Sequence, residues 1–180
     1  MTLKKFLTSA LIGVCTMTLL ACSNQKAQDY SANTPELTIQ KYFNGPSKAY
    51  GLLQNWSGKQ TRRFSVTMQG HWHDVNKGEL HEEFVFSDGE KQTRDWTLTM
   101  TDAHHFTATA HDVVGVAKGE QYGNTIHMSY VLAVPVNGKI INLNVDDWLY
   151  AINEQIVINK STLKKFGLTV GQLTIAFKKE

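Results

Sequence analysis

Short stretches in which apolar and polar residues alternate run through the chain from about residue 47 onward. Phe64 to Met68 alternates in this way, residues 125–134 place five large apolar side chains on one face, and Leu173 to Phe177 alternates again. A period of two is that of a β-strand with one buried face. No long stretch repeats apolar residues at the i, i+3, i+4 spacing of a helix. The pattern therefore predicts an all-β protein.

Residues that favour turns separate these stretches at short intervals, at Ser57-Gly58, Asn76-Lys77-Gly78, Ser87-Asp88-Gly89, Tyr122-Gly123-Asn124, Asn137-Gly138 and Asn153-Glu154. This spacing predicts an up-and-down antiparallel meander of eight to ten strands. Such a sheet has to close into a barrel or fold into a sandwich to cover its apolar face and its edges. One short helix is expected near the C-terminus, over residues 161–167, with Ser161 as its N-cap and Gly167 as its C-cap.

The hairpin that turns at Ser87-Asp88-Gly89 predicts charged side chains inside the barrel. A two-residue loop would bring an apolar face against a polar one, whereas a three-residue loop matches the apolar faces of both strands. We expect the longer loop to place Phe84 opposite Arg94 and Glu82 opposite Trp96. Glu82 and Arg94 would then lie diagonally near each other on the inward face.

Two interpretations of this pair remain open. Glu82 and Arg94 can form a structural ion pair, because an unpaired buried charge costs several kcal/mol. Alternatively, Arg94 offers its planar donor fork to the carboxylate or phosphate head group of a ligand, and Glu82 orients it. Trp96, Tyr130 and Trp148 would form the wall of the ligand cavity in the second case and ordinary core in the first.

The first 21 residues have the pattern of an export signal. Lys4 and Lys5 precede an apolar run that ends in Leu19-Leu20-Ala21-Cys22, which matches the bacterial lipobox. Cleavage before Cys22 would leave a cysteine that carries acyl chains as a membrane anchor. A transmembrane helix is the alternative, but the run contains four hydroxyl residues and falls short of the roughly 20 residues that a span needs.

The residues after this cysteine predict the location of the mature protein. Ser23 in the position after a lipidated cysteine is typical of outer-membrane lipoproteins of Gram-negative bacteria, so we expect a protein anchored at the periplasmic face of that membrane. Residues 22–36 are polar and without periodicity, which predicts a lipidated flexible tether before a barrel domain over residues 37–180. With Cys15 removed and Cys22 lipidated, no cysteine is left for a disulfide, a nucleophile or a metal site.

Composition and charge restrict the classes of partner. The chain has 180 residues, of which 42% are hydrophobic and 19% charged, as in a single globular domain. Removal of Lys4 and Lys5 with the signal reduces 18 basic residues to 16, which equals the number of acidic residues. A net charge of zero gives no electrostatic reason to expect a nucleic acid partner.

The sequence contains none of the common catalytic motifs, such as the nucleophile elbow, the His-Glu-x-x-His zinc motif, the phosphate loop or the dinucleotide fingerprint. Asp146 and Asp147 could form an acid pair, but adjacent strand residues point to opposite faces. A turn or strand-end role is favoured for them. We expect no cofactor, and no particular reaction is indicated.

Three histidines raise the question of a metal site. His71 and His73 share one strand face, and an odd-numbered turn after them would bring His81 to the same face, where three imidazoles could bind zinc. An even-numbered turn would send His81 to the opposite face. Histidines exposed on the outside of a barrel explain the pattern equally well, and we expect no metal.

A set of short motifs resembles a known family: Phe43-Asn44-Gly45, Ala49-Tyr50-Gly51, Arg63-Phe64, Glu82-Glu83-Phe84, Ser87-Asp88-Gly89, Arg94-Asp95-Trp96, Asp146 to Tyr150 and Lys165-Phe166-Gly167. Together they resemble a family of bacterial lipoproteins known only as a domain of unknown function. The resemblance implies a lipocalin-like β-barrel lipoprotein and, through genes that tend to lie near cyclopropane-fatty-acid-synthase-like methyltransferases, a link to acyl chains. Lipocalins carry Gly-x-Trp where Phe43-Asn44-Gly45 stands, so no ligand site is transferred from them.

Three functions remain open on this basis. The first is an outer-membrane-anchored protein that binds a fatty acid or another lipid in its barrel, with Arg94 at the head group. The second is an envelope assembly factor with a filled barrel, for which an exposed apolar patch and no cavity are expected. The third is a lipid-modifying enzyme that uses Glu82 or His81, for which a carboxyl group with a raised pKa in an accessible pocket is expected.

Overall fold

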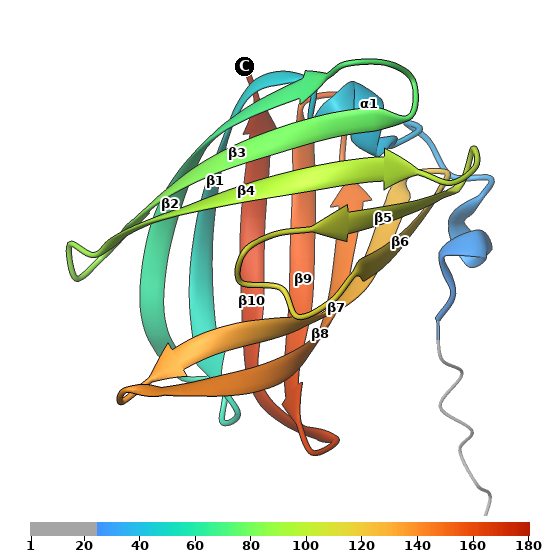
Figure 1. Ribbon diagram of the computed structural model, residues 1–180. Helices are drawn as coiled ribbons and strands as arrows, with labels where there is room; N and C mark the ends of the chain where they lie inside the picture. Colours follow the sequence, from blue (N-terminus) through green and yellow to red (C-terminus); the bar gives the residue numbers. More distant parts are fainter. Residues whose placement is uncertain (1–24) are drawn as a thin grey trace, which may run out of the picture.

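Ten antiparallel strands form one closed barrel in the computed structural model, which describes residues 25–180 (Figure 1). The strands are β1 (Gly45–Asn55), β2 (Gln60–Trp72), β3 (Lys77–Phe86), β4 (Lys91–Met100), β5 (His105–Thr109), β6 (Ala117–Tyr122), β7 (Thr125–Val136), β8 (Lys139–Ala151), β9 (Ile156–Lys165) and β10 (Leu168–Lys179). Each strand pairs with its neighbours in the chain, and β1 pairs with β10 to close the barrel. The predicted all-β, up-and-down barrel is confirmed.

The two ends of the barrel differ. The short helix α1 (Ile39–Tyr42) covers one end, where Leu37, Ile39, Tyr42 and Phe43 are buried (Figure 1). Lys179 at the end of β10 donates hydrogen bonds to backbone carbonyl groups around this helix and fastens it to the barrel. The turns β1–β2, β3–β4, β7–β8 and β9–β10 lie at the opposite end, which we call the mouth.

The predicted helix over residues 161–167 is wrong, and the one α-helix of residues 25–180 lies near the N-terminal end of that range instead. Ser161 and Leu163 continue β9 with their side chains inward, so the alternation of this segment prevails over its capping residues. Phe166 and Gly167 form the two-residue turn to β10. Their φ angles of 50° and 80° are both positive, as a type I′ hairpin turn requires.

The segment before the barrel packs against it instead of hanging free. The short 3₁₀ helix η1 (Ala27–Tyr30) buries Ala27 completely and places the ring of Tyr30 against Trp148 and Tyr150, at centroid distances of 6.3 and 5.7 Å. The prediction of a flexible tether is therefore wrong from Gln25 onward, and the boundary at Leu37 is too late. Gln25 and Gln28 also donate hydrogen bonds to Tyr150 and Glu120 of the barrel, and none of these contacts leaves a periodic signal in the sequence.

The predicted signal peptide, residues 1–21, and the predicted lipidation site Cys22 lie outside the described residues. Among residues 25–180, no helix is long and apolar enough to cross a membrane. All ten strands and the buried cluster that connects them lie within this range. A chain that begins at Ser23 therefore contains the complete barrel.

Candidate functional site: a cavity inside the barrel

The barrel encloses a cavity of about 410 Å³ that extends from the mouth toward α1. Its walls are mainly the apolar side chains that the alternation predicted to be inward, among them Phe64, Val66, Phe84, Leu132 and Ile175. The volume lies within the range of small-molecule sites, which is roughly 300–1,000 Å³. A second hollow, bordered by Tyr50 and Val85, lies on the outer face and is largely open to solvent.

The hairpin of β3 and β4 brings two charged side chains into this cavity. Its loop has three residues, as predicted, and Gly89 adopts a φ of 86° within it. The register is shifted from the predicted one by two residues along β4, because Phe86 and Glu90 pair directly beside the loop. Glu82 is consequently opposite Arg94, not diagonal to it, and Leu80 is opposite Trp96.

A third residue, Asp112, completes what we call the interior cluster with Glu82 and Arg94. Arg94 Nε lies 3.1 and 3.0 Å from the two carboxylate oxygens of Asp112, and Nη2 donates to Oδ2 at 2.7 Å. Nη1 lies 3.6 Å from Glu82 Oε2. The donor fork that one of the two interpretations assigned to a ligand is therefore occupied by Asp112. Sequence reasoning missed Asp112 because it lies between strands and carries no periodic signal.

Burial sets the protonation of this cluster. It raises the pKa of Glu82 to about 7, although Arg94 and a hydrogen bond from Trp96 Nε1 at 3.3 Å both oppose that rise. Burial also opposes the charge on Arg94, but the neighbouring carboxylates of Glu82 and Asp112 outweigh it and raise the pKa of the guanidinium. Arg94 therefore stays charged, whereas Glu82 exchanges its proton near neutral pH.

Asp147 adds a third carboxyl group to the cavity. Asp147 lies within β8 and points inward, while Asp146 points outward. The turn or strand-end role favoured from the sequence is therefore wrong for both residues. Asp147 Oδ1 accepts hydrogen bonds from Ser161 Oγ at 2.7 Å and from the amide of Asn159. Burial raises the pKa of Asp147, and these two donors partly counteract the rise.

The predicted aromatic walls divide between the two faces of the barrel. Trp96 and Tyr130 line the cavity with their ring centroids 5.6 Å apart in an edge-to-face arrangement, and burial raises the pKa of Tyr130 well above its usual value. Trp148 lies on the outer face, stacks on His127 at 4.1 Å and donates a hydrogen bond from Nε1 to Asp146 at 3.0 Å. Trp148 is therefore not a cavity wall, because the alternation of β8 turns Leu149 inward in its place.

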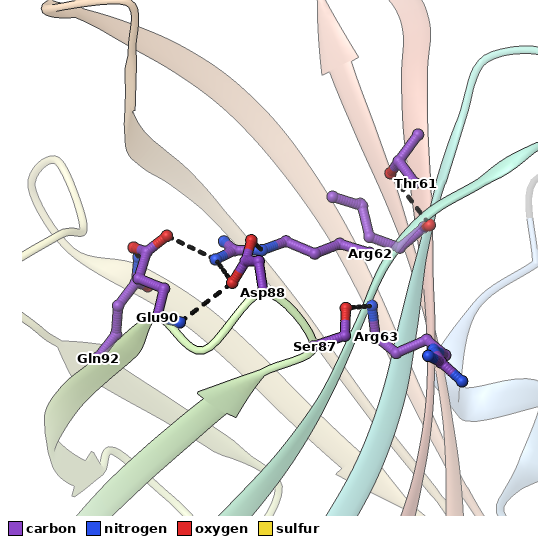
Figure 2. Close-up of polar contacts among 8 residues, drawn as sticks. Thr61, Arg62, Arg63, Ser87, Asp88, Glu90 and Gln92 are labelled. Atoms are coloured by element: carbon purple, nitrogen blue, oxygen red, sulfur yellow. Dashed lines mark hydrogen bonds and ion pairs between the residues drawn. The ribbon is translucent and has the colours of Figure 1, made fainter.

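A second arginine with two carboxylates, the mouth cluster, lies where the cavity opens (Figure 2). Arg62 Nε and Nη2 each donate to Asp88 at 2.7 Å, and Nη2 also donates to Glu90 at 2.5 Å. The guanidinium lies 3.7 Å from the centroid of the Phe86 ring. Figure 2 shows the side chain of Arg62 reaching from β2 to the β3–β4 turn, so the cluster links these two elements at the mouth.

The histidines lie on the outside of the barrel. The β2–β3 turn holds three residues, which puts His81 on the same face as His71 and His73, but His81 is paired with Gln69 and hydrogen-bonds to Asp95 at 2.5 Å. Over residues 25–180 no group of three or more histidine, cysteine, aspartate or glutamate side chains has an arrangement that could hold a metal ion. His81 is exposed and does not line the cavity, so it does not belong to the candidate site.

Comparison with known proteins identifies the fold. A family described as "Protein of unknown function (DUF3833)" matches residues 16–179. No curated protein matches the chain. An S-type phycobiliprotein lyase, CPES from Guillardia theta, superposes with a TM-score of 0.58 at 8% identity, over 87% of this chain and 98% of the lyase. The structure of EF1p2_mFAP2b bound to DFHBI gives a TM-score of 0.43 at 10% identity, over 79% of this chain and 100% of that one. At such low identity the lyase shows a shared fold alone, and the predicted lipocalin-like barrel is confirmed at that level.

Proposed function

The chain belongs to this family of proteins of unknown function, and we propose that it binds one lipid-like molecule inside its barrel. The observation that carries the proposal is the cavity of about 410 Å³, which is enclosed by apolar side chains and opens at the mouth. A barrel filled by its own side chains, as the assembly-factor hypothesis requires, would have no such cavity. Each methylene that moves from water into apolar surroundings contributes about 0.8 kcal/mol to the free energy of binding. An acyl chain inside this apolar cavity would therefore bind favourably.

The interior cluster gives the cavity a polar end. Because Asp112 already occupies the fork of Arg94, a ligand carboxylate would have to displace it and would enter beside Glu82 and Asp147. There it would be repelled by the negative charge of the neighbouring carboxylates. A ligand group that donates a hydrogen bond is not repelled, since the carboxyl oxygens can accept that hydrogen bond. We therefore place the polar end of the ligand against Glu82, Arg94, Trp96 and Tyr130, and we expect a hydroxyl or amide head group to be preferred to a carboxylate.

Calorimetric titration of residues 23–180 with dodecanol and dodecanoate tests both parts of this proposal. Dodecanol is expected to bind at one molecule per chain, and more tightly than dodecanoate at pH 8. Leu132→Trp would fill the cavity and abolish binding, whereas Val85→Trp, on the outer face, would not. Absence of binding by both probes would overturn the proposed function, and tighter binding of dodecanoate would overturn only the assignment of the head group.

A second candidate function is supported by one observation. The pKa of Glu82, raised to about 7 in a cavity, is the feature expected of a general acid or base in a lipid-modifying enzyme. The two functions differ in the fate of the ligand. A carrier returns the bound lipid unchanged, whereas an enzyme converts it, and mass analysis of lipid incubated with wild type and with Glu82→Gln distinguishes them.

We also propose that the barrel is attached to the periplasmic face of the outer membrane through acyl chains on Cys22. The lipobox and Ser23 support this proposal. Growth of a Gram-negative host with labelled palmitate is expected to label the full chain and not a Cys22→Ala variant. Equal labelling of both chains would exclude Cys22 as the attachment site.

A further inference from the structure

The rim of the mouth has two halves with different chemistry. Strand order around the barrel runs β2, β1, β10, β9, β8, β7, so the β1–β2, β9–β10 and β7–β8 turns are neighbours along one half. Figure 1 shows these three turns together at the end of the barrel opposite α1. The β3–β4 turn and the β5–β6 connection make up the other half.

The first half exposes large apolar side chains in or beside each of its three turns. Trp56 is 78% exposed on the β1–β2 turn, Phe166 and Leu168 are 90% and 73% exposed around the β9–β10 turn, and Ile140 is 65% exposed beside the β7–β8 turn. Soluble proteins seldom gather such residues in one exposed region unless it contacts a partner or a membrane. We call this half the apolar rim.

The charges of the two halves are opposite. The segments of the apolar rim, residues 53–61, 134–143 and 162–172, contain four lysines and neither aspartate nor glutamate. The lysines are Lys59, Lys139, Lys164 and Lys165. The other half, residues 86–91 and 110–116, carries three acidic residues, Asp88, Glu90 and Asp112, and one lysine, Lys91. A surface that combines exposed aromatic and aliphatic tips with lysines complements the apolar interior and the anionic phosphates of a lipid bilayer.

We propose that the apolar rim docks on an anionic bilayer surface and so turns the cavity mouth toward the lipid. Trp56, Phe166, Leu168 and Ile140 would enter the boundary between head groups and acyl chains, and the lysines would contact phosphates. Leu53, Pro135 and Leu163 belong to the same three segments and line the cavity. A lipid-like molecule could then pass between bilayer and barrel along these segments with little exposure to water. Docking extends the proposed function and does not depend on what occupies the cavity.

The closed end of the barrel supplies the matched control. Val75 on the β2–β3 turn and Ile152 on the β8–β9 turn are 79% and 61% exposed, which is comparable with the apolar rim. Acidic residues stand beside both, namely Asp74 and Glu154. This end therefore offers similar exposed apolar tips without the one-sided positive charge.

Vesicle sedimentation of residues 23–180, which lack the expected anchor, tests the proposal. The probes are vesicles of phosphatidylcholine alone and vesicles with added phosphatidylglycerol. Wild type is expected to sediment with the anionic vesicles and with a blue shift of tryptophan fluorescence. The combined variant Trp56→Ser, Phe166→Asn, Leu168→Ser is expected to bind about tenfold more weakly or worse. Each Lys→Gln change at Lys59, Lys139 or Lys165 is expected to weaken binding to anionic vesicles about fivefold.

The control variant Val75→Ser with Ile152→Ser is expected to bind as wild type does. All substituted residues lie in or beside exposed turns, and asparagine is chosen at Phe166 because it tolerates the positive φ there. Circular dichroism checks that each variant keeps the barrel. The proposal is overturned if the wild-type protein does not sediment with anionic vesicles, or if the control variant loses as much binding as the rim variant. It is also overturned if the apolar rim mediates self-association of the chain without vesicle binding.

Discussion

The interior cluster and the mouth cluster have almost the same composition and opposite physical behaviour. Each contains one arginine, two carboxylates and an aromatic ring near the guanidinium, with distances of 5.4 Å for Arg94 to Phe84 and 3.7 Å for Arg62 to Phe86. Inside the barrel, burial raises the pKa of Glu82 to about 7. At the mouth, hydrogen bonds from Gln92 and Arg62 lower the pKa of Glu90. Exposure to water, not the choice of residues, decides which cluster titrates near neutral pH.

The largest difference is expected when each arginine is removed. Arg94→Met leaves two carboxyl groups in the barrel without their cation, which should lower the free energy of unfolding by about 3–5 kcal/mol at pH 8. Arg62→Met leaves Asp88 and Glu90 free to be hydrated, so its effect should be a small fraction of that. Urea unfolding followed by tryptophan fluorescence measures both. Equal losses in the two variants would contradict the distinction between the clusters.

The next difference concerns pH. Folded Glu82 holds its proton up to about pH 7, whereas the unfolded chain releases it near 4.5, so the wild-type protein loses stability as pH rises between these values. The loss amounts to about 3 kcal/mol. Glu82→Gln cannot ionise and should be more stable than wild type at pH 8, with the difference vanishing near pH 4.

Glu90→Gln at the mouth is the matched control for this measurement. The lowered pKa of Glu90 means that its ionised form stabilises the folded state above the unfolded pKa and that this contribution disappears as pH falls. The variant should therefore be slightly less stable than wild type at pH 8. Unfolding curves that show the same pH dependence for both variants would refute the assignment of the raised pKa to Glu82.

The smallest effect is expected from salt. At about 1 M salt the screening length falls to roughly 3 Å, which weakens interactions between exposed charges much more than those between buried ones. A double-mutant cycle of Arg62→Met and Asp88→Asn should give a coupling energy that decreases between low and high salt. The corresponding cycle of Arg94→Met and Asp112→Asn should give a coupling energy that stays constant. A decrease in both would mean that water reaches the interior cluster.

The sequence predicts the barrel well because strands and turns leave local signals. Alternation at residues such as Val66 and Ile126 identifies inward faces, and the Asn137-Gly138 pair marks a hairpin turn. The prediction of a helix over residues 161–167 was wrong because Ser161 and Gly167 are compatible with helix caps. The alternation that buries both Ser161 and Leu163 belongs to a strand instead.

The candidate site is less predictable because it depends on contacts between elements. Glu82 and Arg94 are placed inside by the pattern of their hairpin, but their direct pairing follows from how the strands meet at the loop. Asp112 reaches Arg94 from a connection without periodicity, and no local signal indicates it. Trp148 was predicted to face the interior, because β8 carries apolar residues on both faces and its sequence does not show which face is inward. On the outer face Trp148 is covered by Tyr30 of the N-terminal segment.

Native mass spectrometry of residues 23–180, purified gently from a bacterial host, measures whether the barrel holds one lipid-like molecule. We expect close to one bound lipid per chain, identifiable after denaturation. We also expect Leu132→Trp to lose that lipid and Val85→Trp to keep it. A clean mass of the protein alone that stays unchanged after addition of dodecanol, or a bound lipid that Leu132→Trp retains, would show that the cavity is not the lipid site.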